Sequence, residues 1–397
     1  MSNREETSCV VLGLGVNGLG VVRSLGRNHL RVIGIYTREG ELGRHSRYCK
    51  AIKFPLLEKN NQEFLDKLCN LGKSLGKAVI FSTNDKYVQF VSDFRDKLSE
   101  YFLINLPEKD IVAKMNSKDG IRELAQECGV KIPQTKQINS KADLEYVNKH
   151  FNFPVLIKPF KTYNNEYFKG KKNLIVQSPK ELTSIYESAT GLFSTSLAQE
   201  IIRGGDNHII MPSFYFDKES RPLASCTTRK VRQYLPDYGI ACYLKTEGVP
   251  KVEEIALSFL QKLKFKGIVL LEFAESVKTG DYYLLEANLR SCYVNQLFSD
   301  CGINFSYINY LYLTNPSLLQ GLKFKQKNGI YWIDFIRDLA SFSRKYKQNK
   351  ITFFHWFKTA LKARSFAIFA FDDLLPAFVS LSLFIRGVSL KRLSLKI

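Results

Sequence analysis

The sequence contains no Cys-x-x-Cys pair, although eight cysteines are spread along its 397 residues. Zinc ribbons and dense disulfide frameworks need cysteines at close and regular spacing, so neither is expected. Scattered cysteines of this kind fit a protein of the reducing cytoplasm. The five histidines show no metal-site spacing either, and we expect each of them to be structural or on the surface.

The sequence also lacks a long uninterrupted apolar run. Its longest apolar stretch, from Phe366 to Ile385, is interrupted by Asp372 and Asp373, and about twenty apolar residues are needed to cross a bilayer. The first thirty residues show no basic start followed by an apolar run and a cleavage site. We therefore expect a globular, cytoplasmic protein, long enough for two or three packed domains.

Acidic residues are too few to balance the basic ones: 38 Asp and Glu stand against 58 Lys and Arg, a formal net charge of +20. Between Lys323 and Ile397, fifteen Lys and Arg stand against four Asp, a net charge of +11. Such an excess favours anionic partners, which include nucleic acid, an acidic membrane surface and phosphorylated small molecules.

Glycines at positions 13, 15, 18 and 20 follow the apolar run Ser8 to Leu14 and precede a second run, Leu30 to Ile35. This order predicts strand, tight turn, helix and strand, because glycine permits a sharp turn and close packing of the helix. The turn suits a dinucleotide phosphate or a structural role. Residues 36–38 are Tyr, Thr and Arg rather than the acidic residue of NAD sites, so a structural role, or contact with another ligand, is favoured.

A second alternation of helix and strand follows. Helical patterns cover residues 64–75 and 88–98, and between them lie an apolar strand at 78–82 and a polar turn, Thr83-Asn84-Asp85. Alternating strands and helices predict a parallel, doubly wound sheet. We expect this first α/β domain to cover residues 1–109.

Two later segments combine apolar strands with charged residues. The strand Val155-Leu156-Ile157 ends at Lys158, whose ammonium must reach water or a charged ligand; taken alone, a surface lysine is the favoured explanation. Further along, the runs 267–273 and 282–290 are separated by a Lys-Thr-Gly-Asp turn and predict a hairpin.

Carboxylates and an amide interrupt the apolar pattern of this hairpin. Because side chains alternate along a strand, Glu286, Asn288 and Arg290 share one face, and Glu272 can meet them from the other strand. Their oxygens suit magnesium that also holds nucleotide phosphates, and Arg290 can bind phosphate. A metal site is favoured over the alternative, an arginine that neutralises two glutamates on a polar face.

In this order the features resemble the ATP-grasp superfamily of carboxylate-amine ligases, in the group related to D-aspartate ligase and carbamoyl-phosphate synthase. The resemblance implies a Rossmann-like pre-ATP-grasp domain over 1–109 and a two-lobed α+β ATP-binding region over 110–319, hinged near 199–206. A basic, aromatic-rich and mostly helical extension follows over 320–397.

The resemblance also implies residues that bind ATP. Asn-Ser-Lys-Asp places Lys118, and Phe-Pro-Val-Leu-Ile-Lys-Pro places Lys158, on the nucleotide phosphates. Ala-Gln-Glu-Ile-Ile resembles the hinge that contacts adenine, and Asp206 would hold the ribose hydroxyls. The contacts implied for adenine are Glu200, Ile201 and Ile202.

For metal and catalysis, the resemblance assigns Mg²⁺ or Mn²⁺ to Glu272, Glu286 and Asn288, and phosphate contact to Arg290. Arg-Lys-Val-Arg-Gln resembles a substrate-facing segment, which implies that Lys230 and Arg232 lie near the acyl phosphate or the substrate carboxylate. One family feature is altered: residues 160–172 contain a single glycine, where many family members have a glycine-rich loop over the phosphates. Two interpretations of the loop's lysines stay open, contact with phosphate or a solvated cluster; these lysines are Lys169, Lys171 and Lys172.

The implied reaction activates a carboxylate as an acyl phosphate and joins it to an amine, in cell-surface polysaccharide or envelope metabolism. The competing hypothesis is an ATP-binding or nucleic-acid-binding protein without ligase activity, although no nucleic-acid module is recognisable. A third hypothesis, an NAD oxidoreductase, has less support because the acidic residue of NAD sites is absent. The substrates and the oligomeric state are not specified by the sequence.

Residues 320–397 leave two interpretations open. Aromatic and aliphatic residues recur there at helical spacing with basic residues between them. Such helices suit peripheral contact with an anionic membrane at its inner face, without spanning it. The same residues suit packing against the ligase core.

Overall fold

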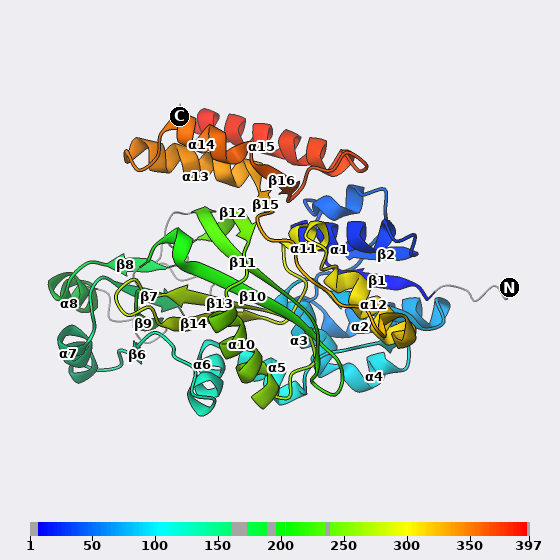
Figure 1. Ribbon diagram of the computed structural model, residues 1–397, viewed down its shortest axis with the longest axis horizontal. Coiled ribbons are helices and arrows are strands. Elements are labelled where there is room, and N and C mark those ends of the chain that lie inside the picture. The colour runs from blue at the N-terminus through cyan, green and yellow to red at the C-terminus, as the bar shows by residue number, and fades with distance from the viewer. Residues whose placement is uncertain (1–6, 160–172, 189–195, 203, 235–238, 395–397) are drawn as a thin grey trace.

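The computed structural model describes residues 7–159, 173–188, 196–202, 204–234 and 239–394. Figure 1 shows the central part of the molecule flanked along its long axis by the N-terminal domain at one end and by helices α7 and α8 at the other. Helices α13, α14 and α15 form a separate layer along one side.

The N-terminal domain is built on a five-stranded sheet in the order β3-β2-β1-β4-β5, with every neighbouring pair parallel. This confirms the predicted doubly wound sheet. The strands are β1 (Cys9–Leu12), β2 (Val32–Tyr36), β3 (Lys50–Lys53), β4 (Ala78–Ser82) and β5 (Phe102–Leu103). The helices are α1 (Val16–Gly26), η1 (Leu42–His45), α2 (Asn61–Ser74), α3 (Asp85–Asp93) and α4 (Arg95–Ser99).

The glycine turn before α1 is closed by a side chain of the chain itself. Gly13 has φ of +87°, and a Cβ at Gly18 would lie 2.0 Å from the Gly13 carbonyl oxygen. The Glu41 carboxylate accepts hydrogen bonds from the backbone N–H of Leu14 at 2.5 Å and of Thr37 at 2.8 Å. A carboxylate therefore already holds one N–H group of this turn, which supports the structural role.

A four-stranded antiparallel sheet in the order β6-β9-β7-β8 forms the first lobe of the middle region. Leu144 and Val147 of α7 pack on Val155 and Ile157 of the sheet. The two α7 residues are three apart and so share one helix face, and the two strand residues are two apart and so share one face of the sheet. The elements are β6 (Thr135–Gln137), α7 (Lys141–His150), β7 (Val155–Pro159), β8 (Leu174–Val176), α8 (Pro179–Ser188) and β9 (Ser196–Glu200).

The largest sheet has seven strands in the order β14-β13-β10-β11-β12-β15-β16. One face packs against α10, whose buried residues recur at helical spacing: Val252, Ala256, Phe259 and Leu260. Its strands are β10 (Ile209–Phe216), β11 (Pro222–Tyr234), β12 (Ile240–Thr246), β13 (Gly267–Glu275), β14 (Tyr282–Asn288), β15 (Tyr331–Ile333) and β16 (Ala363–Phe366). Associated helices are α5 (Lys109–Met115), α6 (Lys118–Glu127), η3 (Asp206–His208), α10 (Pro250–Lys262), α11 (Asn295–Asp300), α12 (Phe305–Thr314) and η4 (Pro316–Leu319).

The C-terminal extension contributes both to this sheet and to the outer layer. Strands β15 and β16 belong to the sheet, and Trp332 in β15 is fully buried. The remainder is helical: α13 (Phe335–Lys347), α14 (Phe353–Ala360) and α15 (Leu375–Ser394). Part of the extension therefore packs against the core, and the seven-stranded sheet includes strands from both sides of residue 320. The predicted domain limits themselves stay predictions.

Candidate active site

The predicted hairpin is formed by β13 and β14, and it brings two glutamates together. Glu272 lies directly opposite Glu286, and Leu270 lies opposite Asn288. Opposite residues of antiparallel strands point to the same face, so Glu272, Glu286 and Asn288 share a face as the alternation predicts. Glu286 is exposed, whereas Asn288 is buried.

Lys230 of β11 joins this group from across the sheet. Its Nζ lies 2.7 Å from Glu272 Oε2, although β10 separates β11 from β13. Lys230 is only 4% exposed, and a buried ammonium needs a charge partner. Glu272 supplies that charge, which places the predicted catalytic lysine beside a predicted metal ligand.

Arg290 follows the end of β14 and connects two domains. Its Nη2 donates to Asn288 Oδ1 at 2.6 Å, and its Nε donates to Asp85 Oδ1 at 2.7 Å. Asp85 is the first residue of α3, at the carboxyl end of β4 in the N-terminal domain. Sequence reasoning identified residues 83–85 only as a polar turn. Their place at the carboxyl edge of a parallel sheet, where ligands bind in such folds, is the signal that could have singled out Asp85.

Cys292, close to this group, is a protonated thiol. Burial raises its pKa to about 12, and its Sγ donates to the Arg290 carbonyl oxygen at 3.3 Å. A thiol with so high a pKa is a poor nucleophile at neutral pH.

The donor set of the hairpin suits a hard cation. Within the part of the chain that the structure describes, no three His, Cys, Asp or Glu side chains form a metal-binding group. The predicted set differs from that pattern because its third member is the Asn288 amide. Two carboxylates and an amide oxygen are nevertheless ligands that Mg²⁺ accepts, usually with water and substrate phosphates completing the shell. The magnesium assignment stays a prediction.

The predicted nucleotide contacts lie on the four-stranded sheet and on α6. Lys158 Nζ donates to Gln199 Oε1 at 2.5 Å, and Gln199 is held in turn by Thr135. Glu200 ends β9 and accepts two hydrogen bonds from Asn152. Its side chain therefore points away from Gln199, the partner of Lys158. Ile201 and Ile202 are half-buried between β9 and η3, and Lys118 is exposed at the start of α6.

Asp206 and Arg232 contact the C-terminal extension instead of solvent. Asp206 accepts from Gln233 Nε2 at 2.9 Å and from Lys345 Nζ of α13 at 2.6 Å. Arg232 donates to Asp338 Oδ1 and Oδ2 at 2.7 and 2.9 Å. Their sequence assignments, to ribose and to substrate, stay predictions.

Asp338 is the centre of a buried network that the sequence did not indicate. It is fully buried, and it also accepts from Trp356 Nε1 at 2.8 Å. Arg232 stacks on Tyr243 with 4.0 Å between the guanidinium carbon and the ring centre. The extension therefore holds β11, the strand that also carries Lys230.

One predicted feature lies outside the described residues: the altered loop 160–172 with Lys169, Lys171 and Lys172.

No protein-family model matches the sequence. Among curated proteins, the chain is similar to D-aspartate ligase of Enterococcus faecium (strain Aus0004), with 23% identity over 308 residues that cover 72% of each protein.

Solved structures with the same fold come from several enzymes. N5-carboxyaminoimidazole synthetase of Staphylococcus aureus, solved with ADP, superposes with a TM-score of 0.64 at 13% identity and covers 88% of both chains. The biotin carboxylase domain of Hydrogenobacter thermophilus 2-oxoglutarate carboxylase, solved with MgADP and bicarbonate, gives 0.60 at 15% identity, covering 83% of this chain and 74% of that one. L-amino acid ligase of Bacillus licheniformis gives 0.56 at 13%, covering 81% and 76%.

Proposed function

We propose that this chain is an ATP-grasp carboxylate-amine ligase, which activates a small carboxylic acid with ATP and joins it to an amine. The similarity to a D-aspartate ligase supports a substrate of the amino-acid or small-acid class. The observation that carries the proposal is the Glu272–Glu286 pair, with Lys230 at 2.7 Å from Glu272 and Arg290 on Asn288.

The reaction requires the protein mainly to position the substrates and to neutralise charge. A carboxylate is a poor electrophile, and phosphorylation gives it a leaving group, after which the amine attacks the acyl carbon. We assign Lys118 and Lys158 to the ATP phosphates, and Arg290 to the charge that develops during phosphoryl transfer. Mg²⁺ held by Glu272, Glu286 and Asn288 would neutralise phosphate charge.

Lys230 and Arg232 have different parts in this proposal. Lys230 pairs with Glu272, and its ammonium is available to an anionic substrate if Glu272 turns to a cation. Arg232 is the proposed carboxylate contact from the substrate-facing segment, with Asp338 as its present partner. Glu200, Ile201, Ile202 and Asp206 remain the proposed adenosine contacts.

Release of ADP tests the proposal directly. The protein is incubated with MgATP and pools of carboxylic acids, with and without pools of amines. We expect ADP release to depend on an acid and an amine together, and mass spectrometry to detect the amide. ADP release that no acid or amine pool increases would contradict the ligase and favour an ATP-binding protein.

Replacing Lys158 or Lys118 by Met is expected to weaken ATP binding about 10- to 100-fold each, because a hydrogen bond to a charged group contributes about 1.5–3 kcal/mol. Isothermal titration calorimetry with MgATP measures this. Lys180→Met is the matched control, since Lys180 is an exposed lysine on α8 of the same lobe and should leave affinity unchanged. Wild-type affinity in both Lys118 and Lys158 variants would refute the assignment.

We also propose a peripheral position at the inner face of an anionic membrane, with a role in envelope or surface-polysaccharide metabolism. The net charge of +11 between Lys323 and Ile397 supports this location. None of the helices in the described part of the chain is sufficiently long and apolar to span a bilayer.

A further inference from the structure

The layer formed by α14, α15 and the loop before α15 exposes many large apolar side chains. Phe354 is 83% exposed and Phe371 is 86% exposed. Soluble proteins rarely leave apolar groups of this size uncovered in one region. We name this set the outer face; its members are Phe353, Phe354, Phe357, Leu361, Phe369, Phe371, Leu374, Leu375, Phe378, Leu381, Leu383, Phe384 and Ile385.

Within α15, exposure extends around the whole helix. Each residue from Leu381 to Arg386 is exposed, and six consecutive residues cover more than one full turn of 3.6 residues. Only Ser382 and Arg386 in that segment are polar. A helix that is apolar on all sides needs apolar surroundings, because water on every side leaves its side chains unfavourably hydrated.

The outer face is bordered by positive charge. Lys358, Lys362, Arg364 and Arg386 are all exposed, and Arg344, Lys347 and Lys350 are exposed on the adjoining α13 and the turn after it. Asp372 and Asp373 are the only acidic residues between Phe353 and Arg386. Both are ion-paired within the molecule, so the charge presented to a partner is basic.

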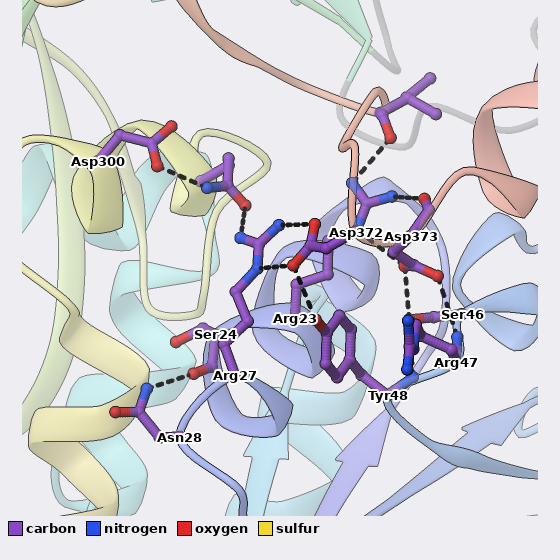
Figure 2. Close-up of polar contacts among 12 residues, drawn as sticks. Arg23, Ser24, Arg27, Asn28, Ser46, Arg47, Tyr48, Asp300, Asp372 and Asp373 are labelled. Atoms are coloured by element: carbon purple, nitrogen blue, oxygen red, sulfur yellow. Dashed lines mark hydrogen bonds and ion pairs between the residues drawn. The ribbon is translucent and has the colours of Figure 1, made fainter.

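These ion pairs fix the base of α15 on the N-terminal domain, as Figure 2 shows. Asp373 accepts from Arg23 of α1 at 2.9 Å and from Ser46 at 2.7 Å, and this pair is buried. Asp372 accepts from Arg27 Nε and Nη2, both at 2.8 Å, and from Tyr48 at 2.7 Å. The hydrogen bonds from Arg27 hold the pKa of Asp372 below its usual range. The start of α15 is therefore anchored, whereas the segment from Leu381 to Arg386 is exposed.

An anionic lipid surface matches both properties of the outer face. A second copy of the chain, with its own charge of +20, would bring like charges together, and nucleic acid would pair the basic side chains but leave the phenylalanines and leucines in water. Lipid headgroups take the lysines and arginines, and acyl chains take the apolar side chains.

The length of the apolar segment sets the depth of contact. The eleven α15 residues from Leu375 to Ile385 span about 17 Å at about 1.5 Å per residue, little more than half of the about 30 Å hydrocarbon core. The segment therefore suits one leaflet, with Arg386 returning to the headgroups.

We infer that the outer face is a monotopic lipid-binding surface that inserts Phe354, Phe371 and the α15 segment Leu381–Ile385 into one leaflet of an anionic membrane. This specifies the partner surface of the proposed peripheral location and rests on it. Insertion adds an apolar contribution that simple attraction of the basic extension lacks.

Vesicle co-sedimentation with the full-length protein tests this. The vesicles contain phosphatidylcholine alone or phosphatidylcholine mixed with phosphatidylglycerol, in about 0.1 M and about 1 M salt, where the Debye length is about 10 and 3 Å. We expect binding to the anionic vesicles only, reduced but not abolished by high salt. The double variant Phe354→Ser/Phe371→Ser should bind at least about tenfold more weakly, since burying a Phe contributes about 1.5–3 kcal/mol.

Val277→Ser is the matched control, because Val277 is an apolar residue, 60% exposed, in the β13–β14 turn. It should bind vesicles like the wild type. Unchanged binding by the double variant, or complete release by high salt, would overturn insertion. No binding to anionic vesicles, together with dimers in analytical ultracentrifugation, would assign the face to a second copy. ADP release without lipid is measured on the same variants. If a variant loses vesicle binding but releases ADP normally, the result supports the lipid-binding surface independently of the ligase proposal. If the wild type releases no ADP, only the ligase proposal is rejected.

Discussion

Replacing Glu286 by Gln is expected to lower ADP formation by about 100-fold or more, since even residues that only orient metal ligands contribute about 10- to 100-fold to affinity or activity. The substitution removes a negative oxygen ligand but keeps the size of the side chain. Because Glu286 is exposed, the free energy of unfolding should change by no more than about 0.5 kcal/mol. Steady-state ADP release at saturating acid and amine measures the effect.

Glu254→Gln is the control for this substitution, as Glu254 is an exposed glutamate on α10. Its turnover should equal that of the wild type. Repeating the Glu286→Gln assay over a range of Mg²⁺ concentrations tests whether Glu286 acts as a metal ligand. Partial recovery at high Mg²⁺ supports a ligand, and undiminished turnover at low Mg²⁺ would reject the metal assignment.

Replacing Asp338 by Ala is expected to destabilise the protein by about 3–5 kcal/mol, because it leaves the buried Arg232 guanidinium without its carboxylate partner. Asp338 is fully buried and accepts from Arg232 and Trp356. Urea unfolding followed by tryptophan fluorescence measures the change, and the chain's two tryptophans, Trp332 and Trp356, both lie in the C-terminal extension.

Asp66→Ala is the control, because Asp66 pairs with Lys97 on the surface, at 3.6 Å, and such pairs contribute at most about 1 kcal/mol. The double variant Arg232→Met/Asp338→Leu replaces the buried pair by apolar groups and should recover much of the stability. If stability returns without turnover, Arg232 contacts the substrate as proposed; if both return, its role is to anchor the extension. Equal stability of Asp338→Ala and wild type would contradict the buried network.

Local patterns were sufficient for much of the fold. The parallel N-terminal sheet follows from alternating strands and helices, and the β13–β14 hairpin follows from two apolar runs around a short turn with Gly280 at φ of +67°. A short turn and a period of two residues fix which side chains share a face, so Glu272, Glu286 and Asn288 lie on one face as the alternation predicts, while their role as metal ligands stays a prediction. The two strands within the C-terminal extension were missed because each is only three or four residues long.

The sequence by itself determined the fold class and the glutamate pair, because both depend on residues close together along the chain. Only the tertiary structure decided which distant charges meet them. Lys230 reaches Glu272 across an intervening strand, Arg290 reaches Asp85 of another domain, and Arg232 is held by Asp338 of the extension. Such ion pairs are selected by burial, since a charge removed from water must find a partner wherever folding places one, and no periodicity in the sequence records that choice.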